Sequence, residues 1–378
     1  MNKKLLAFSL LLLGLAKGVC AYAQDSLSVA DSLFAAGKFT EAINTYSGVN
    51  TRHADVQIAK AYDQLGNYGK SVLQYEYLVT KYPEDLQLKR DLGALLFRTR
   101  KFESAAATYE SLLSIDSLNP ELNYKQGQVF YAWNKDSIAI RYFQRAFELD
   151  TNHVKSAIAL GEHYLKYRKY DTVHFYADRG LTIAPEHAKL LNIKALAWFN
   201  NYRFKEAVPY FEKLMANNYR DQYILMRLAH SYAETWEPQK ALKLYKEVVK
   251  VDADQADAYN AMGKIYFKHK QLDSAMVCFK KVIAINNTDL SNEYVSIASI
   301  YRAKEDLNSA LTYYKMAADE DPDNALIYYN VCEIIDKLYA DKQVKLRYYE
   351  KFLNEYSDSV YMTVFRKKVE DRIAELKG

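Results

Sequence analysis

The sequence predicts an all-α protein, an α-solenoid of about ten stacked helix–turn–helix repeats followed by a C-terminal capping helix. Two series of small residues, each with a period of 34 residues, carry this prediction. The first series is Ser71, Ala105, Ala139, Val173, Ala207, Ala241 and Ala275, with Ala310 one residue late. The second leads it by twelve residues and is Gly93, Gly127, Gly161, Ala195, Ala229, Gly263 and, one residue late, Ala298. Self-similarity at a fixed period of about 20–50 residues indicates a solenoid or another repeat array.

Each repeat contains two windows with the apolar spacing of an amphipathic helix. Ala275, Phe279, Val282 and Ile285 form one such stripe. The small residue of each stripe lets two antiparallel helices approach closely, and the aromatic residue one turn away fills the adjoining space. A single helix pair cannot bury its apolar face alone, so neighbouring pairs must stack.

Two short sequence steps recur with the period. One is small-x-x-x-aromatic, as from Ala241 to Tyr245, and the other is Leu/Met/Ile-small-x-x-Tyr, as from Met262 to Tyr266. In these steps and in its 34-residue period, the chain resembles the tetratricopeptide repeat family over roughly residues 24–356. The resemblance implies paired helices whose first members line a concave groove, and a role in binding other proteins.

The period divides the chain into a leader (1–23), a repeat array (24–356) and a capping helix (357–378). Repeats are expected to start near residues 23, 52, 86, 120, 154, 188, 222, 256, 291 and 325. Repeat six departs from the pattern at Lys194 and at Pro209, which falls inside its second helix. Either that helix starts after the proline and Lys194 extends to solvent, or a bend divides the solenoid into two lobes with a pocket at the joint.

The amino terminus has the organisation of a secretory signal peptide. A basic start precedes an apolar stretch from Leu5 to Leu15, and Ala21-Tyr22-Ala23 supplies a cleavage site after Ala23. The stretch is too short to span a bilayer, which needs about 20 apolar residues. Lys17 fits poorly before a lipidated cysteine, which disfavours lipidation at Cys20. We therefore expect an exported, periplasmic protein without an integral membrane segment.

Charge and motifs exclude several classes of function. The chain carries 51 Lys and Arg against 47 Asp and Glu, and removal of the leader brings it close to neutrality, so no nucleic-acid partner is expected. The seven histidines form no metal-ligand motif with one another or with cysteine. The sequence contains no phosphate-binding loop and no Gly-x-Ser-x-Gly turn. We expect no enzyme activity, no metal, no cofactor and no small-molecule substrate.

Two cysteines, Cys278 and Cys332, remain after cleavage. A disulfide requires Cα atoms within about 7 Å, and repeat nine separates the two residues. We expect two unpaired thiols.

Seven Asp-Ser/Thr-aliphatic tripeptides resemble the acceptor motif of a periplasmic O-glycosylation system found in some bacteria. They begin at Asp25, Asp31, Asp116, Asp136, Asp171, Asp273 and Asp358. Asp and Ser are also preferred at the starts of helices, where they act as caps. The sequence leaves both interpretations open.

The family resemblance places partner contacts at repeat positions 2, 5, 9, 12 and 13, which share one helix face. The candidate residues are Arg90, Phe97, Arg98, Tyr124, Gln128, Tyr131, Lys155, Glu162, Asn192, Phe199, His230, Lys264 and Phe267. The same positions also offer Lys166, Lys189, Tyr223, Met226 and Asn260. Aromatic and Arg side chains contribute strongly to protein interfaces, although position 12 is equally suited to packing between repeats. The Lys/Asn carboxylate clamp of chaperone-binding family members is absent.

These patterns predict a non-enzymatic, exported scaffold that binds one or more cell-envelope proteins through its concave face. The alternative is an envelope glycan- or peptidoglycan-associated protein that uses aromatic stacking. Nutrient-binding outer-membrane proteins with such repeats carry the sugar site on long loops, and this chain lacks such insertions.

Overall fold

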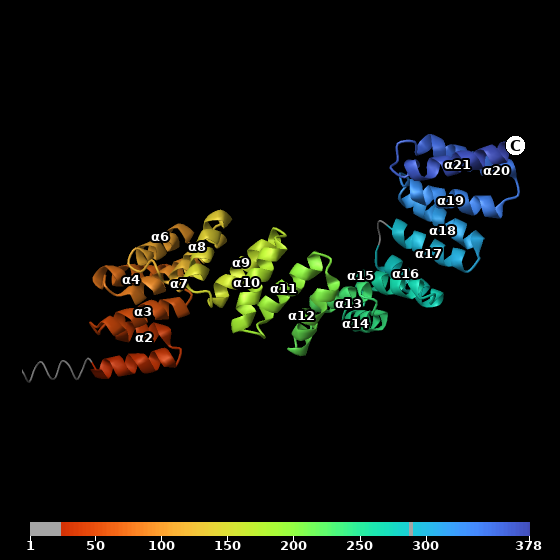
Figure 1. Cartoon of the computed structure of the whole chain (residues 1–378). Helices are drawn as coiled ribbons and strands as arrows, with labels where there is room; N and C mark the ends of the chain where they lie inside the picture. Colours follow the sequence, from red (N-terminus) through yellow and green to blue (C-terminus); the bar gives the residue numbers. More distant parts are fainter. Residues whose placement is uncertain (1–23, 287–289) are drawn as a thin grey trace, which may run out of the picture. The chain divides into compact units, whose positions relative to one another are not determined.

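The computed structural model of the chain describes residues 24–286 and 290–378 (Figure 1). The signal peptide expected at residues 1–23, its cleavage site and Cys20 lie outside the described residues. Within those residues every regular element is a helix, which confirms the all-α fold class. No helix of the described part has the length and apolar character needed to cross a membrane.

The helices follow one another in pairs. A helix over residues 24–35 precedes α2 (Phe39–Tyr46). The first helices of the next nine pairs are α3 (Arg52–Gln64), α5 (Leu86–Arg98), α7 (Pro120–Ala132), α9 (Val154–Lys166), α11 (Ala188–Asn200), α13 (Gln222–Glu234), α15 (Ala256–Lys268), α17 (Ser291–Ala303) and α19 (Ala325–Leu338). Their second helices are α4 (Tyr68–Lys81), α6 (Phe102–Leu113), α8 (Asp136–Leu149), α10 (Tyr170–Ile183), α12 (Phe204–Ala216), α14 (Pro238–Val251), α16 (Leu272–Ile285), α18 (Leu307–Glu320) and α20 (Lys342–Glu355). The last helix, α21 (Met362–Lys377), confirms the expected cap.

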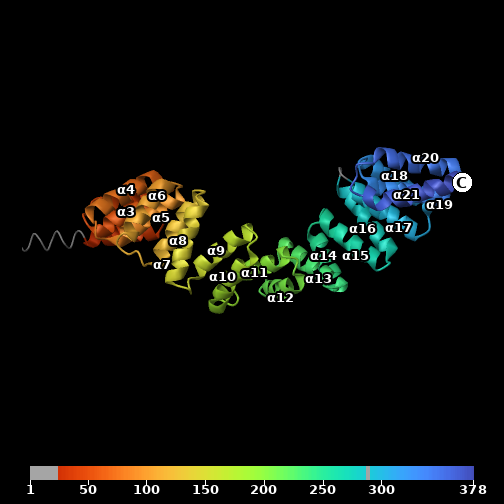
Figure 2. The ribbon, with the colours of Figure 1, turned by 45° about the horizontal axis from the view of Figure 1, so that its top comes forward.

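The chain forms two compact units, a first unit that ends at Pro185 and a second that begins at Glu186. Along the chain this division falls between α10 and α11, where repeat six begins. Within each unit, consecutive helices lie side by side and antiparallel, as both views show (Figures 1 and 2).

Close helix crossings explain the small residues of the two series. A Cβ atom at Gly127 would lie 2.6 Å from the ring of Phe143, and one at Gly263 would lie 2.9 Å from the ring of Phe279. Neither distance is tolerated between carbon atoms, so the aromatic ring of the second helix occupies the space that glycine leaves on the first.

The turn between the two helices of repeats one to nine contains one residue with positive φ. These residues are Gly37 (74°), Gly66 (71°), Arg100 (61°), Asn134 (58°), Arg168 (56°), Tyr202 (59°), Trp236 (64°), Lys270 (59°) and Glu305 (64°). Glycine adopts this left-handed conformation without strain, whereas large side chains resist it. The stacking of the helices, rather than local preference, therefore sets the turn.

In repeat six, the second helix does not start where one of the two interpretations of the sequence expected it to. The prediction that its second helix starts after Pro209 is wrong, because α12 begins at Phe204 and contains the proline. Ala207 and Phe211, fully buried on either side of the proline, hold this stretch against its neighbours. Lys194 is buried, with its ammonium 4.9 Å from the centre of the Tyr210 ring.

Cys278 in α16 and Cys332 in α19 are both buried free thiols, as expected. Burial raises the pKa of the Cys278 thiol to about 11 and also raises the pKa of Cys332. Both side chains are therefore protonated and unreactive in the folded protein.

Candidate partner-binding groove

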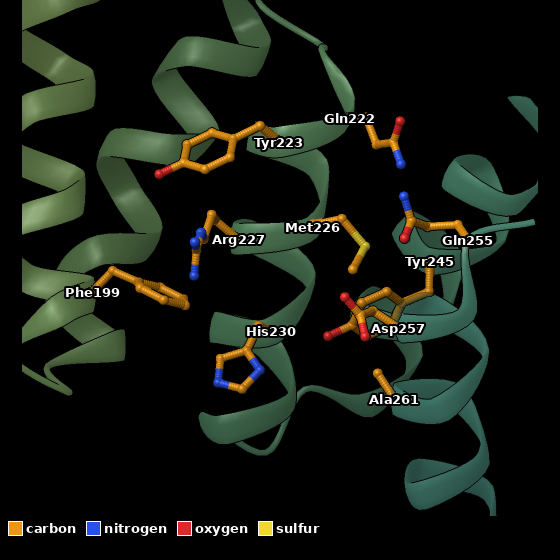
Figure 3. A pocket seen from close by; sticks show the side chains of 10 residues that line it. All are labelled: Phe199, Gln222, Tyr223, Met226, Arg227, His230, Tyr245, Gln255, Asp257 and Ala261. Atoms are coloured by element: carbon orange, nitrogen blue, oxygen red, sulfur yellow. The ribbon is translucent and has the colours of Figure 1, made fainter. Parts of the chain in front are cut away.

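A groove of about 650 Å³ lies among the first helices α11, α13 and α15 of the second unit (Figure 3). Its lining residues are Phe199, Gln222, Tyr223, Met226, Arg227, His230, Tyr245, Gln255, Asp257 and Ala261. Half of them come from α13, whose residues at three- and four-residue intervals share one face. Because α13 and α15 contact each other directly, side chains of both helices reach the same space.

Arg227 lies on one side of the groove, between two aromatic rings (Figure 3). Its guanidinium is 4.8 Å from the centre of the Phe199 ring and 5.0 Å from that of Tyr223. Such contacts stabilise a cation by roughly 0.5–2 kcal/mol and fix its orientation. In residues 24–286 and 290–378, the five N–H donors of this side chain meet no hydrogen-bond acceptor and no carboxylate. The groove therefore presents an oriented cation whose donors are not used by any described residue.

His230 closes one end of the groove and packs against two rings. Its ring centre lies 5.4 Å from that of Phe199 and 5.2 Å from that of Phe204. Burial lowers the pKa of the imidazole below its ordinary value of 6.5; nearby Glu234 raises it, while Arg227 and Lys264 lower it further. His230 is thus neutral near pH 7 and offers one donor and one acceptor nitrogen.

The other end of the groove is polar, and its floor is apolar. Gln222 and Gln255 each direct a side-chain amide to one oxygen of Asp252, at 3.4 Å. Met226 and the buried ring of Tyr245 form the floor. A methionine adapts its shape to different apolar groups, so this floor accepts side chains of varied outline.

The chemistry of the groove is that of binding. It combines ring faces, one oriented cation, amides and the exposed carboxylate of Asp257. Among the described residues, no three His, Cys, Asp or Glu side chains are arranged to hold a metal ion.

The groove unites some of the residues expected from sequence. Phe199, His230, Tyr223 and Met226 all line it. The remaining candidates of the second unit do not. Lys264 and Phe267 are exposed on α15, and Asn192 is half-buried on α11, with an Oδ1 atom that no hydrogen bond satisfies in the described part. Lys189 is exposed on α11, and the amide of Asn260 donates to Glu293 at 3.1 Å.

Several candidates of the first unit are engaged within the chain. Arg98 donates to Asp63 of the preceding repeat, and Lys155 pairs with Glu121 at 3.1 Å. The amide of Gln128 donates to the hydroxyl of Tyr124 at 3.0 Å. These polar groups serve contacts within and between repeats, which leaves them less available to a partner.

The other first-unit candidates differ in exposure. Phe97 packs against the apolar core, and Arg90 is half-buried on α5. Tyr131 is 44% exposed, and Glu162 is exposed on α9.

Six lining residues were not predicted as site residues: Gln222, Arg227, Tyr245, Gln255, Asp257 and Ala261. Arg227 carries a signal that sequence analysis could have used, since it lies four residues after Tyr223 and three before His230 on one helix face. Tyr245 carries none, because it belongs to a second helix and occupies a position predicted for the core.

Comparisons with known proteins agree with this architecture. Residues 56–120 match a family model described as tetratricopeptide repeat, and residues 256–289 and 294–324 match another model of the same description.

Several proteins are similar in sequence to part of this chain. Stress-induced-phosphoprotein 1 of Caenorhabditis elegans is 26% identical over 182 residues, which cover 47% of this chain and 55% of that protein. DnaJ homolog subfamily C member 3 of Gallus gallus is 22% identical over 259 residues, 63% of this chain and 49% of that protein. This chain spans about half the length of these two relatives. Human protein O-mannosyl-transferase TMTC1 is 23% identical over 211 residues, which are 55% of this chain and 24% of the transferase.

Solved structures give similar but distant matches. Yeast Tom70 has a TM-score of 0.41 and 12% identity, covering 94% of this chain and 96% of that one. Pseudomonas aeruginosa PilF has a TM-score of 0.43 and 13% identity, covering 59% and 98%. At these scores neither likeness carries weight for function. Over the matched residues the chain is similar to the tetratricopeptide repeat family, and its helix pairs have the arrangement expected of such repeats.

Proposed function

We propose that this protein is a non-enzymatic scaffold that holds a partner protein by binding an extended segment of it in the groove. A cavity of about 650 Å³ accommodates a few side chains rather than a folded domain. It extends along one face of α13, with the amide of Gln222 and the ring of Tyr223 near the start of that helix and Phe199 and His230 nearer its end (Figure 3). Rings suit apolar side chains, and amides suit the peptide backbone.

The observation that carries this proposal is the state of Arg227. A guanidinium held between two rings, with no acceptor among the described residues, is already oriented, so a partner bears less of the entropic cost of ordering it. Arginine and aromatic side chains supply most of the energy of protein interfaces where they lie together in a hollow. A role limited to folding would be served better by a carboxylate beside Arg227.

We further propose that the protein acts in the cell envelope after export. The support is the sequence of residues 1–23, with its basic start, apolar stretch and Ala21-Tyr22-Ala23 site. The partners would then be other envelope proteins. Fractionation of cells that produce the full chain, with amino-terminal sequencing of the periplasmic form, tests this location. A chain found in the cytoplasm with its leader intact would contradict it.

Site-specific photo-crosslinking tests the groove. A photoreactive phenylalanine analogue would replace Met226 on the groove floor in the full chain, and Val277, an apolar residue of α16 that is 68% exposed, in a matched control. We expect discrete crosslinked partners from position 226 and none of these from position 277. The same adducts from both positions would show adhesion to exposed apolar groups and would reject the groove.

A further inference from the structure

Two large aromatic residues occupy strained positions next to the groove. Tyr202 and Trp236 lie in the turns that follow α11 and α13, with φ values of 59° and 64°. Repeats one and two use Gly37 and Gly66 at the same place, where this conformation is free of strain. Repeat four uses Asn134, which tolerates it better than an aromatic residue does.

The folded chain gains little burial from these two rings. Tyr202 is 82% exposed and Trp236 is 74% exposed. The contact of Trp236 with Lys268, whose ammonium lies 3.7 Å from a ring centre, is made at the surface. The turn imposes this conformation in repeats one to nine, but only Tyr202 and Trp236 combine it with a large, exposed aromatic ring. Strain without burial is a cost to folding, and exposed aromatic rings are frequent anchors of protein interfaces.

A row of rings joins this edge to the groove. The ring centre of Tyr202 lies 6.2 Å from that of Phe204, and Phe204 lies 5.2 Å from His230, which closes the groove. His230 in turn lies 5.4 Å from Phe199. A segment that leaves the groove past His230 therefore meets aromatic surface without interruption as far as Tyr202.

Unpaired charge on the same helices favours an acidic segment. Four cations of the groove and its edge have no acidic partner in the described part of the chain: Arg227, Lys264, Lys268 and Lys270. The acids that lack a basic partner among those residues are not spread evenly. Glu234 lies near His230, whereas Asp252, Asp254 and Asp257 lie at or just before the start of α15. Near His230 and the two turns, cations therefore outnumber acids, and complementary charge guides both the encounter and the choice of partner.

We propose that Tyr202 and Trp236 form a second contact surface, the turn edge, for the segment bound in the groove. This segment is an extended acidic polypeptide whose apolar or aromatic side chains stack on the two rings, while its carboxylates face Arg227 and the lysines of α15. The inference rests on the proposed function, because it extends the same binding site. A neutral glycan would use the rings but would gain nothing from the unpaired cations.

The test combines a defined probe with substitutions that relieve strain. The probe is an array of synthetic peptides built from Asp, Glu, Phe, Leu and Gly; its controls are the same array with Asn and Gln in place of the acids, and a soluble chitin oligosaccharide. Full-length mature protein would be compared with Tyr202→Asn, Trp236→Asn and the double variant by fluorescence anisotropy with the best acidic peptide. Arg100→Asn makes the same exchange at the same turn position of repeat three, in the first unit. Arg227→Ala reports on the groove alone.

We expect the acidic array to bind and the neutral array to bind weakly. The double variant should bind the acidic peptide about tenfold or more weakly, while its melting temperature stays equal to or above that of the parent. Arg100→Asn should show the same direction of stability change with no loss of affinity. This combination excludes a purely structural role, since a structural residue would lose stability together with binding.

Three outcomes would overturn the inference. Normal affinity in the double variant, with a loss in Arg227→Ala, rejects the turn edge and leaves the groove standing. Normal affinity in both rejects the groove as well. Binding of the oligosaccharide but not of the acidic array, or equal binding of the acidic and neutral arrays, rejects an acidic polypeptide as the occupant.

Discussion

Two hollows in the second unit use the same kinds of side chain in opposite ways. The groove described above contains an arginine between rings with unused donors. The other hollow, about 310 Å³ among α19, α20 and α21, is also lined by tyrosines and charged residues. There, however, the charges meet each other. Both oxygens of Asp336 accept from Arg372 at 2.8 Å, and Lys345 lies 3.1 Å from the same carboxylate.

The aromatic residues differ in the same way. In the capping hollow, the ring of Tyr329 stacks on Phe365 of α21 at 4.2 Å, so the chain covers its own ring. In the groove, Phe199 meets the guanidinium of Arg227, and the open side of that pair faces the cavity. Polar and aromatic groups satisfied within the chain stabilise the fold, whereas oriented groups left without partners serve binding. The residue composition of the two hollows is similar, and the contacts that their side chains make are what distinguish them.

The largest expected effect comes from breaking the capping network. Asp336→Ala removes the acceptor shared by Arg372 and Lys345 and leaves two cations side by side. Lys345 is only 14% exposed, while Arg372 is 35% exposed, which moderates the penalty through solvent screening. We expect a loss of about 2–3 kcal/mol in the free energy of unfolding. Urea titration followed by circular dichroism measures it.

A local readout and a control sharpen this prediction. Cys332 lies buried on α19, beside the network, and Cys278 lies on α16. Asp336→Ala should speed labelling of Cys332 by a thiol reagent without denaturant and leave that of Cys278 almost unchanged. Glu370→Ala removes a carboxylate from an exposed pair on α21, worth well under about 1 kcal/mol. Equal effects of the two substitutions would contradict the special place given to Asp336.

The opposite profile is expected from Arg227→Ala. It should weaken binding of the best acidic peptide by about 1–2 kcal/mol, with a stability loss of under about 1 kcal/mol from the missing cation–ring contacts. Arg227→Lys keeps the charge but lacks the planar group that stacks on Phe199, so its affinity should fall in between. Calorimetric titration and thermal unfolding separate the two quantities. A large stability loss with unchanged affinity would place Arg227 with the capping residues instead.

Sequence periodicity predicted the fold because each helix crossing requires a small residue, and these crossings recur at a fixed interval along the chain. Gly127 and Gly263 sit against aromatic rings where any Cβ would clash, and such a demand is visible in the sequence as a small residue every 34 positions. Phe199 and His230 were predicted as candidates from the same register. Arg98 and Lys155 shared that register, yet Asp63 and Glu121 engage them from the preceding repeat.

The repeat register could not predict which side chain each charged residue would contact. Whether a charge is satisfied depends on the side chain that the next repeat places opposite, about one period away, and on its rotamer. Arg227 and Arg372 are both arginines on solenoid helices. Only the three-dimensional structure shows that Arg372 meets Asp336, whereas Arg227 meets no acid in the described residues. The positive φ of Tyr202 and Trp236 is also a product of stacking, since neither residue favours it.

The smallest expected effect is a pH dependence that arises in the groove. Burial lowers the pKa of His230 below 6.5, with Glu234 opposing this and Arg227 and Lys264 adding to it. As the pH falls, His230 therefore takes up a proton at a higher pH in the unfolded chain than in the folded chain. The stability contributed by neutral His230 is fully present above pH 6.5 and is lost as the pH falls through the lower pKa of the folded state. We expect this loss to be smaller than the effects of the substitutions above, because it arises from one histidine.

Burial also lowers the pKa of His163 in the first unit, so this residue adds its own pH dependence to the stability of both proteins. Subtracting the stability of His230→Gln from that of the parent cancels this shared effect and leaves the contribution of His230. Melting curves from pH 8 down to pH 5 should show a steeper decline for the parent. A bound acidic peptide should reduce the difference, since its carboxylates favour protonated His230 and raise its pKa. The groove would then bind the acidic peptide more tightly as the pH falls towards 6, the reverse of the trend in stability. Parallel curves for parent and variant, with and without peptide, would show that His230 is screened from both the partner and the solvent.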